Sequence, residues 1–281
     1  MRTQPFGKTG RDVPVIGQGT WNIERGERKS AVAALRRGLD LGMTHIDTAE
    51  MYGSGRSEDI VGEAIKGRRR EDLFIVSKVL PDNASRAGVK TACERSLTHL
   101  KTDYLDCYLL HWRGGNPLEE TFAGFEALRA AGKISAWGVS NFDADDLDEA
   151  LAIAGEGKIA CNQVLYHLGV RGIEHSVIPW CEEHGVAVVA YTPFGQSRFP
   201  DGRSVAGRVL EEIAKVHGAT PRQVALAFLT RRPSVFAIPK HSSVPHAEEN
   251  AGAGDLRLTD AEIASIDAAF PRGRASALQM G

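Results

Sequence analysis

Short apolar runs alternate with amphipathic stretches along the whole chain. The runs are mostly continuous, which is typical of strands that are buried on both faces of a sheet. They occupy residues 15–21, 44–47, 73–80, 104–112, 136–142, 160–166, 186–194 and 235–240. Segments of helical periodicity occupy residues 27–41, 57–66, 86–100, 117–131, 143–154, 174–184, 205–217, 221–230 and 260–269. This alternation predicts parallel βα units in an α/β fold.

An open doubly wound sheet and a closed barrel both show this alternation. Eight similar units without a break in composition favour closure into a (β/α)8 TIM barrel. Residues 6–15, with Gly7, Gly10 and Pro14, predict a β-hairpin ahead of the first barrel strand, and the last helical segments are extra C-terminal helices. Because no linker is visible, we expect one domain over residues 1–281.

Charge and cysteine content exclude several classes of protein. Lys and Arg number 34 and Asp and Glu 36, a formal net charge of −2, so no basic field favours nucleic acid. No apolar stretch approaches the roughly 20 residues of a membrane span. The four cysteines form no CxxC pair, and His241 and His246 lack a third ligand, so we expect no metal site. We expect a cytoplasmic monomer.

Four polar residues mark the ends of three successive predicted strands. Asp47 ends the second run, Lys78 lies near the end of the third, His111 follows the fourth, and Tyr52 lies in a Gly-rich loop. Catalytic groups of barrel enzymes lie at the carboxyl ends of strands, and neighbouring strands are about 4.8 Å apart. Each residue alone has an ordinary role, as a turn cap, a loop aromatic, an ion-pair partner or a core histidine. Together they favour a catalytic site.

These residue types suit the reduction of a carbonyl group. Lys78 needs a buried partner, and Asp47 is the neighbouring anion. We expect the Lys78 ammonium to lower the pKa of Tyr52 from its ordinary value near 10, so that Tyr52 gives its proton to a developing alkoxide. His111 can donate to the same oxygen. The segment Gly17-Gln18-Gly19 lacks the third glycine of a Rossmann fingerprint, so a nicotinamide must be held in another way.

Six motifs in sequence order resemble the aldo-keto reductase superfamily, most closely its short-loop bacterial members of the methylglyoxal reductase type. They are Ile46-Asp47-Thr48-Ala49-Glu50-Met51-Tyr52-Gly53, Ser77-Lys78, Leu110-His111-Trp112, Gly138-Val139-Ser140-Asn141-Phe142, Asn162-Gln163 and Ile238-Pro239-Lys240. The resemblance implies a (β/α)8 barrel with the catalytic tetrad Asp47, Tyr52, Lys78 and His111. It implies NADPH-dependent reduction of aldehydes and ketones, with small aldehydes such as methylglyoxal among the carbonyl substrates.

The resemblance also assigns the cofactor contacts. Ser140, Asn141 and Gln163 bond the nicotinamide carboxamide, and Tyr191 stacks on its ring. Residues 192–196 follow the pyrophosphate. The 2′-phosphate meets Lys240, Ser242, Ser243 and His246, and the adenine meets Glu249 and Asn250. The full expected set is Gly19, Thr20, Trp21, Asp47, Ser140, Asn141, Gln163, Tyr191, Thr192, Pro193, Phe194, Gly195, Gln196, Lys240, His241, Ser242, Ser243, His246, Glu249 and Asn250.

The substrate pocket is less closely determined. We expect Trp21, Tyr52, His111 and Trp112 to line it. Arg113 is either a contact for an anionic substrate or a solvated arginine at the rim. The tail, residues 271–281, is short, so we expect an open pocket that accepts many aldehydes.

Two other functions use the same residues. Lys78 could be a Schiff-base nucleophile, as in aldolases that share the barrel. Some barrels of this superfamily are instead nicotinamide-binding subunits of ion channels.

His246 generates a testable prediction, because many superfamily members have an arginine there as a ligand of the 2′-phosphate. A histidine is largely neutral at pH 7 and lacks the bidentate guanidinium. We expect His246→Arg to raise the preference for NADPH over NADH, and we expect wild-type affinity for NADPH to rise from pH 8 to pH 6 and to do so less in the variant. Fluorescence titration with both nucleotides measures this, and a pH-independent wild-type affinity would contradict it.

Overall fold

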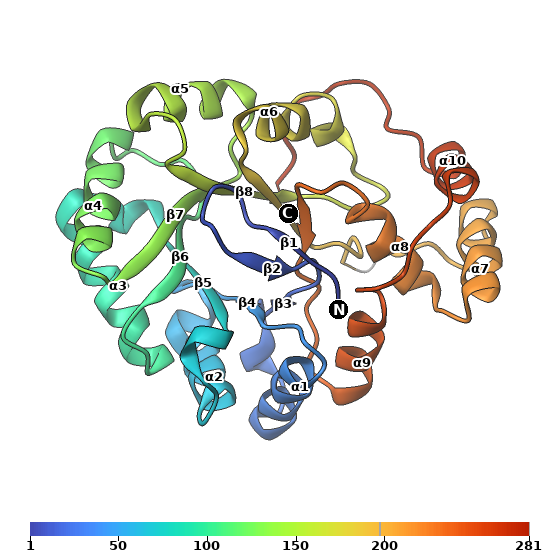
Figure 1. Cartoon of the computed structure of the whole chain (residues 1–281), viewed down its shortest axis with the longest axis horizontal. Helices are drawn as coiled ribbons and strands as arrows, with labels where there is room; N and C mark the ends of the chain where they lie inside the picture. Colours follow the sequence, from blue (N-terminus) through green and yellow to red (C-terminus); the bar gives the residue numbers. More distant parts are fainter. Residues whose placement is uncertain (197, 281) are drawn as a thin grey trace.

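Eight parallel strands form the central sheet of the computed structural model, which describes residues 1–196 and 198–280 (Figure 1). The order in the sheet follows the sequence, from β3 to β10. The strands are β3 (Gln18–Gly19), β4 (His45–Asp47), β5 (Phe74–Val79), β6 (Leu105–Leu110), β7 (Ile134–Ser140), β8 (Ile159–Leu165), β9 (Ala187–Tyr191) and β10 (Val235–Ala237). Each lies within one of the predicted apolar runs or overlaps it.

The sheet closes on itself between β3 and β10. The Gly17 amide donates to the Ala237 carbonyl at 2.8 Å, and the Gly19 amide donates to the Pro239 carbonyl at 3.2 Å. A Cβ atom at Gly19 would lie 2.5 Å from the Ile238 carbonyl oxygen, so the two backbones approach this closely only because residue 19 is glycine. The predicted (β/α)8 barrel is confirmed.

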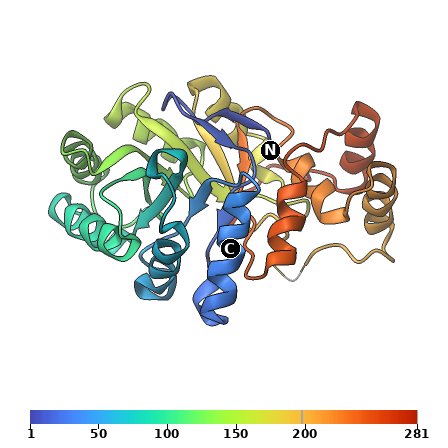
Figure 2. The ribbon, with the colours of Figure 1, turned by 60° about the horizontal axis from the view of Figure 1, so that its bottom comes forward.

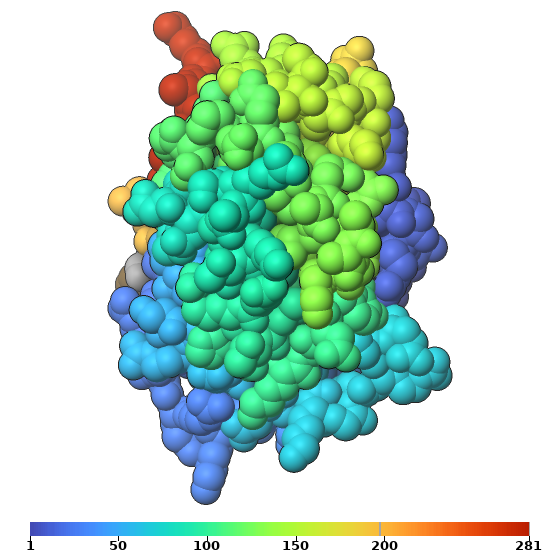
Figure 3. Space-filling view, turned by 90° about the vertical axis from the view of Figure 1, so that its left-hand side faces the viewer, coloured from blue at the N-terminus to red at the C-terminus, as the bar shows by residue number. Residues whose placement is uncertain are grey.

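Helices surround the barrel (Figures 1 and 2). Those after β3 to β6 are α1 (Arg28–Asp40), α2 (Arg56–Ile65), α3 (Arg86–Leu100) and α4 (Leu118–Ala130). Those after β7 to β10 are α5 (Ala144–Ala154), α6 (Val177–His184), α7 (Val205–His217), α8 (Pro221–Leu229), α9 (Val244–Gly252) and α10 (Asp260–Ala269). Segments that follow one another in the sequence lie side by side on the face in Figure 3, and α9 packs beside α1.

Short 3-10 helices occupy several loops. They are η1 (Ile23–Arg25), η2 (Tyr52–Gly55), η3 (Arg70–Asp72), η4 (Pro81–Asn83) and η5 (Gly172–Glu174). Two of them, η1 and η2, lie at the carboxyl ends of β3 and β4, where they shape the mouth of the barrel.

The N-terminal hairpin crosses the other end of the barrel, as predicted (Figure 1). Its strands are β1 (Thr3–Pro5) and β2 (Asp12–Pro14), paired antiparallel. Between them the ring of Phe6 packs 4.7 Å from that of Phe74 and 5.0 Å from that of Phe236, measured between centroids. Apolar inward-facing side chains fill the barrel above this plug, so its interior is a packed core.

His45 is buried in this aromatic cage. Its ring lies edge-on to Phe6 and Phe74, and neither ring nitrogen has a hydrogen-bond partner among the described residues. Burial lowers the pKa of His45 to about 3, and the Lys78 ammonium adds to this shift. In an unfolded chain a histidine has a pKa near 6.5. Between this pH and about pH 3, His45 is therefore protonated in the unfolded chain and neutral in the folded protein.

We predict that His45→Leu makes the fold less sensitive to acid. The unfolded chain binds a proton at residue 45 below about pH 6.5, whereas the folded chain does so only near pH 3. The stability from neutral His45 is therefore lost as the pH falls through this window, by about 1.4 kcal/mol per pH unit. Urea unfolding between pH 7 and pH 4 should show a shallower slope for His45→Leu. Phe74→Leu, a packing control in the same cage, should keep the wild-type slope.

Candidate active site

Three sheet positions bring the predicted tetrad together. Side chains alternate along a strand, so residues two positions beyond an inward-facing core residue also face inward. Lys78 follows inward-facing Phe74 and Val76 in this way, and His111 follows Cys107 and Leu109. Lys78 Nζ lies 2.6 Å from Asp47 Oδ1 and 3.3 Å from Tyr52 Oη. The predicted cluster therefore exists at the mouth of the barrel.

The Asp47–Lys78 pair is completely buried and has further partners. Lys78 Nζ also donates to the Thr48 carbonyl at 2.8 Å, and Gln163 Nε2 donates to Asp47 Oδ2 at 2.7 Å. Burial acts to lower the pKa of Lys78, but Asp47 and Tyr52 outweigh it and the net shift is upward. Lys78 is thus a fixed ammonium group at neutral pH.

The expected shift of Tyr52 is wrong in its sign. Lys78 does act to lower the pKa of Tyr52, as expected from its charge, but burial raises that pKa by more. The phenol lies among side chains that exclude water, which disfavours the phenolate. Tyr52 therefore keeps its proton at neutral pH, and Lys78 stands ready to stabilise the anion formed when the proton leaves.

His111 completes the cluster as a neutral imidazole. Its ring meets the Tyr52 ring edge-on at 5.7 Å between centroids. Burial, with Lys78 as a second cause, lowers the pKa of His111 to about 2. Its Nδ1 has no hydrogen-bond partner in the described part of the chain. A neutral imidazole can donate one hydrogen bond to a polar group that enters the site.

A cavity of about 350 Å³ opens beside these residues. Fourteen of the residues that line it are site residues predicted from the sequence: Gly19, Thr20, Trp21, Asp47, Tyr52, His111, Trp112, Ser140, Asn141, Gln163, Tyr191, Thr192, Gln196 and Lys240. Met51, Ile238 and Met280 line it as well and were not predicted. Ile238 lies between inward-facing Phe236 and Lys240, so strand periodicity could have found it.

The model of the aldo/keto reductase family matches residues 15–270. The chain belongs to this family.

Individual relatives agree with this assignment. The methylglyoxal reductase of Escherichia coli strain K12 is 47% identical over 261 residues, which cover 92% of each chain. The glyoxal reductase of Bacillus subtilis is 34% identical, over 92% of this chain and 90% of its own. A crystal structure of an aldo-keto reductase from Klebsiella pneumoniae in complex with NADPH is 45% identical, with a TM-score of 0.93 over all of both chains.

The other residues expected at the cofactor do not line the cavity of this aldo/keto reductase. They are Pro193, Phe194, Gly195, His241, Ser242, Ser243, His246, Glu249 and Asn250. His241 is buried, where Nε2 lies 2.9 Å from Gln18 Oε1 and Nδ1 lies 3.3 Å from Asn250 Nδ2. These two side chains fasten the segment after β10 to the barrel. His246 is exposed on α9, outside the cavity.

Arg113 is turned to the rim of the barrel. Its guanidinium makes two bonds of 2.7 Å to the Glu149 carboxylate and lies 3.5 Å from Asp146. Arg113 does not line the active-site cavity. Of the two roles expected for it, the solvated rim arginine fits this position.

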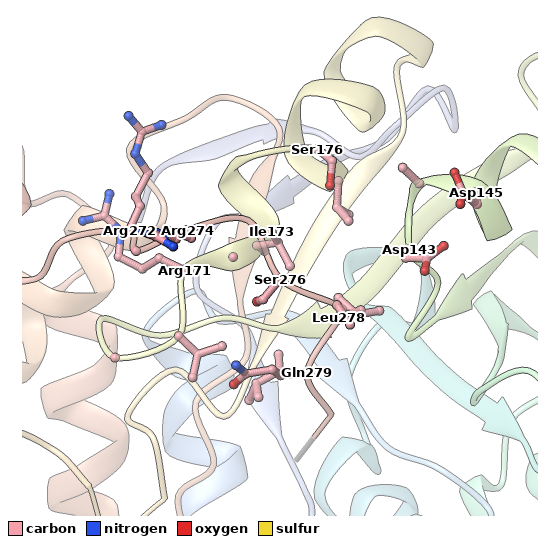
Figure 4. A pocket seen from close by; sticks show the side chains of 18 residues that line it. Asp143, Asp145, Arg171, Ile173, Ser176, Arg272, Arg274, Ser276, Leu278 and Gln279 are labelled. Carbon is pink, nitrogen blue, oxygen red and sulfur yellow. The ribbon is translucent and has the colours of Figure 1, made fainter.

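The C-terminal tail reaches the mouth although it is short. It runs beside a second cavity of about 450 Å³, where Arg272 and Arg274 lie across from Asp143 and Asp145 (Figure 4). Arg171 and His175 fasten its start through the Phe270 and Gly273 carbonyls. Met280 then lines the active-site cavity.

The described residues contain neither a candidate membrane span nor a candidate metal site. No helix in residues 1–196 and 198–280 is long and apolar enough to cross a membrane. Within the same residues, no three His, Cys, Asp or Glu side chains are grouped so as to hold a metal ion.

We predict that Lys78→Met strongly destabilises the protein, because it leaves the Asp47 carboxylate buried without its cation. Removing one partner of a buried pair costs about 3–5 kcal/mol. The double variant Asp47→Asn/Lys78→Met should recover most of this loss, since no charge stays buried. Urea unfolding at pH 7 measures both variants. A double variant no more stable than Lys78→Met would show that packing, and not charge, is responsible.

Proposed function

We propose that this protein reduces aldehydes and ketones to alcohols with NADPH as the hydride donor. One observation supports it above the others. Tyr52 Oη lies 3.3 Å from a buried ammonium group and borders a cavity with room for a substrate and the end of a cofactor. Membership of the aldo/keto reductase family and the NADPH complex of the Klebsiella relative support the same reaction.

The lining of the cavity fits NADPH. At its inner end lie a hydroxyl and two amides, from Ser140, Asn141 and Gln163, which suit the carboxamide of a nicotinamide. Tyr191 is held beside them, since its hydroxyl donates to Asn141 Oδ1 at 2.9 Å. At the outer end Lys240 places a cation where phosphate groups would lie. NADPH supplies a hydride to the substrate carbon when it is bound.

Side chains of the protein supply the proton that the carbonyl oxygen receives. Tyr52 and His111 both border the cavity, so a carbonyl oxygen placed between them meets two donors. Tyr52 gives its O–H proton to that oxygen as negative charge develops on it. The Lys78 ammonium stabilises the phenolate left behind, and Asp47 holds Lys78 in place through the 2.6 Å contact. Trp21 and Trp112 also line the cavity and give it apolar surface.

Small aldehydes such as methylglyoxal are the substrates we propose first. The Escherichia coli and Bacillus subtilis relatives are named as methylglyoxal and glyoxal reductases. We further propose that the protein is a cytoplasmic monomer. The cytoplasmic location is supported by Cys93, Cys107, Cys161 and Cys181, which are all buried free thiols, as in proteins of reducing compartments.

The Schiff-base alternative conflicts with the electrostatics of Lys78. A nucleophilic lysine must lose its proton near neutral pH, whereas the net pKa shift of Lys78 is upward. Borohydride trapping with a carbonyl substrate and no nicotinamide would label Lys78 only if it were the nucleophile. Loss of absorbance at the NADPH band with methylglyoxal separates a reductase from a channel subunit that only binds nucleotide.

We predict that Tyr52→Phe lowers kcat by 100-fold or more and leaves NADPH binding nearly unchanged. The variant keeps the ring and loses only the proton donor, a contribution of about 100- to 10,000-fold in general acid catalysis. Tyr104→Phe is the matched control, because Tyr104 packs under Arg70 away from the cavity. Steady-state kinetics measure kcat for both variants, and titration with NADPH measures their affinity for the nucleotide. Wild-type turnover in Tyr52→Phe would exclude this tyrosine as the acid.

A further inference from the structure

A neighbouring cavity extends the active site at the side of η1 and η2. It measures about 440 Å³ and is lined by Trp21, Asn22, Glu24, Arg25, Met51, Tyr52, Gly53 and Arg56. Trp21, Met51 and Tyr52 also line the active-site cavity. The two cavities are therefore neighbours that share these three side chains. The substrate considered below has its carbonyl group at Tyr52 and extends past Trp21 and Met51 into the second space.

The two loops that form this cavity are fixed to each other. Glu24 Oε2 lies 2.8 Å from Ser57 Oγ, and both side chains are buried. Gly53 has a φ of 58°, and a Cβ there would come within 2.5 Å of Glu24 Cγ, so the loops pack this closely only with glycine. The cavity is thus a built feature of the mouth.

Two arginines give this cavity a positive charge. Arg56 is the first residue of α2, and its Nε donates to the Gly53 carbonyl at 2.9 Å; no carboxylate pairs with it in the described residues. Arg25 has a side chain that is 76% exposed, and Glu24 lies no nearer to it than 4.0 Å. Two guanidinium groups against the one Glu24 carboxylate leave a net charge of 2 − 1 = +1.

The surface between the two cavities is apolar. Trp21 is 44% exposed and Met51 is 38% exposed, which is unusual for such large apolar side chains. Along a path from Tyr52 outward, a substrate would meet a proton donor, then an apolar strip, then two guanidinium groups. A matching ligand would have a carbonyl group, then an apolar part, and then an anionic group.

We propose that the preferred substrates are aldehydes that have an apolar chain or ring ending in a carboxylate. This inference rests on the proposed reductase function and adds a substrate class to it. Guanidinium groups bind carboxylates through paired N–H donors, and a net charge of +1 suits a monoanion. Because the arginines are exposed, their combined effect on kcat/KM should be about tenfold, mainly through KM.

The test compares 4-formylbenzoate with its methyl ester, which has the same ring and aldehyde without the charge. We expect Arg25→Gln/Arg56→Gln to lower kcat/KM for the acid at least fivefold more than for the ester, with NADPH saturating. The charge-reversing pair Arg25→Glu/Arg56→Glu should penalise the acid further. Arg28→Gln is the control, since Arg28 pairs with Glu63 on α2 and lies outside the cavity.

The outcomes separate the two proposals. If the wild type reduces neither compound, nor methylglyoxal, the reductase function itself fails. If the ester is reduced and the variants change acid and ester equally, the function stands and the carboxylate subsite is overturned. A larger loss for the acid, reduced in turn by raising the ionic strength, supports the subsite.

Discussion

The buried pair of Asp47 and Lys78 is the constraint on which the active site depends. A lysine ammonium at zero exposure requires an anion, and Asp47 provides one at 2.6 Å. The same ammonium acts on the pKa values of its neighbours. It opposes the rise in the pKa of Tyr52 that burial causes, and it adds to the fall in the pKa of His111. Its one charge thus adds to the burial that keeps His111 neutral, and it makes the loss of a proton from Tyr52 less costly.

The barrel makes this pair possible because side chains alternate between the inside and the outside of the barrel along each strand. Inward-facing core residues fill the lower layers, and a polar residue follows two positions later on successive strands. On β5 the row is Phe74, Val76 and Lys78, and on β10 and its extension it is Phe236, Ile238 and Lys240. The apolar layers below exclude water, and this exclusion raises the pKa of Tyr52 and of Asp47. The same inward-facing rows of side chains therefore form the packed core at one end and the polar residues of the mouth at the other.

Features that repeat along the chain could be predicted from the sequence. The eight strands, the hairpin and the tetrad follow from periodicity and from polar residues at strand ends. The start of α6 could not be placed by periodicity alone. The expected segment began at residue 174, whereas the helix begins at Val177, so that Pro179 falls in its first turn, where a missing amide is tolerated. The sign of the Tyr52 pKa shift was missed because charge can be read from residue types, but the depth of burial cannot.

Loop and tail positions at the mouth were the least predictable part, and they are also where substrates would be distinguished. Nothing in a pattern of apolar residues places Met280 beside Tyr52, since a tail without regular structure has no periodicity to read. The same holds for Arg25 and Arg56. They line one cavity because Glu24, Gly53 and Ser57 join two loops that are about 30 residues apart in the sequence. The strands thus fix the buried Asp47–Lys78 pair, and the loops fix Tyr52 and the surface around the mouth. A change in loop charge should alter which aldehyde is held without altering the pair of buried charges beneath it.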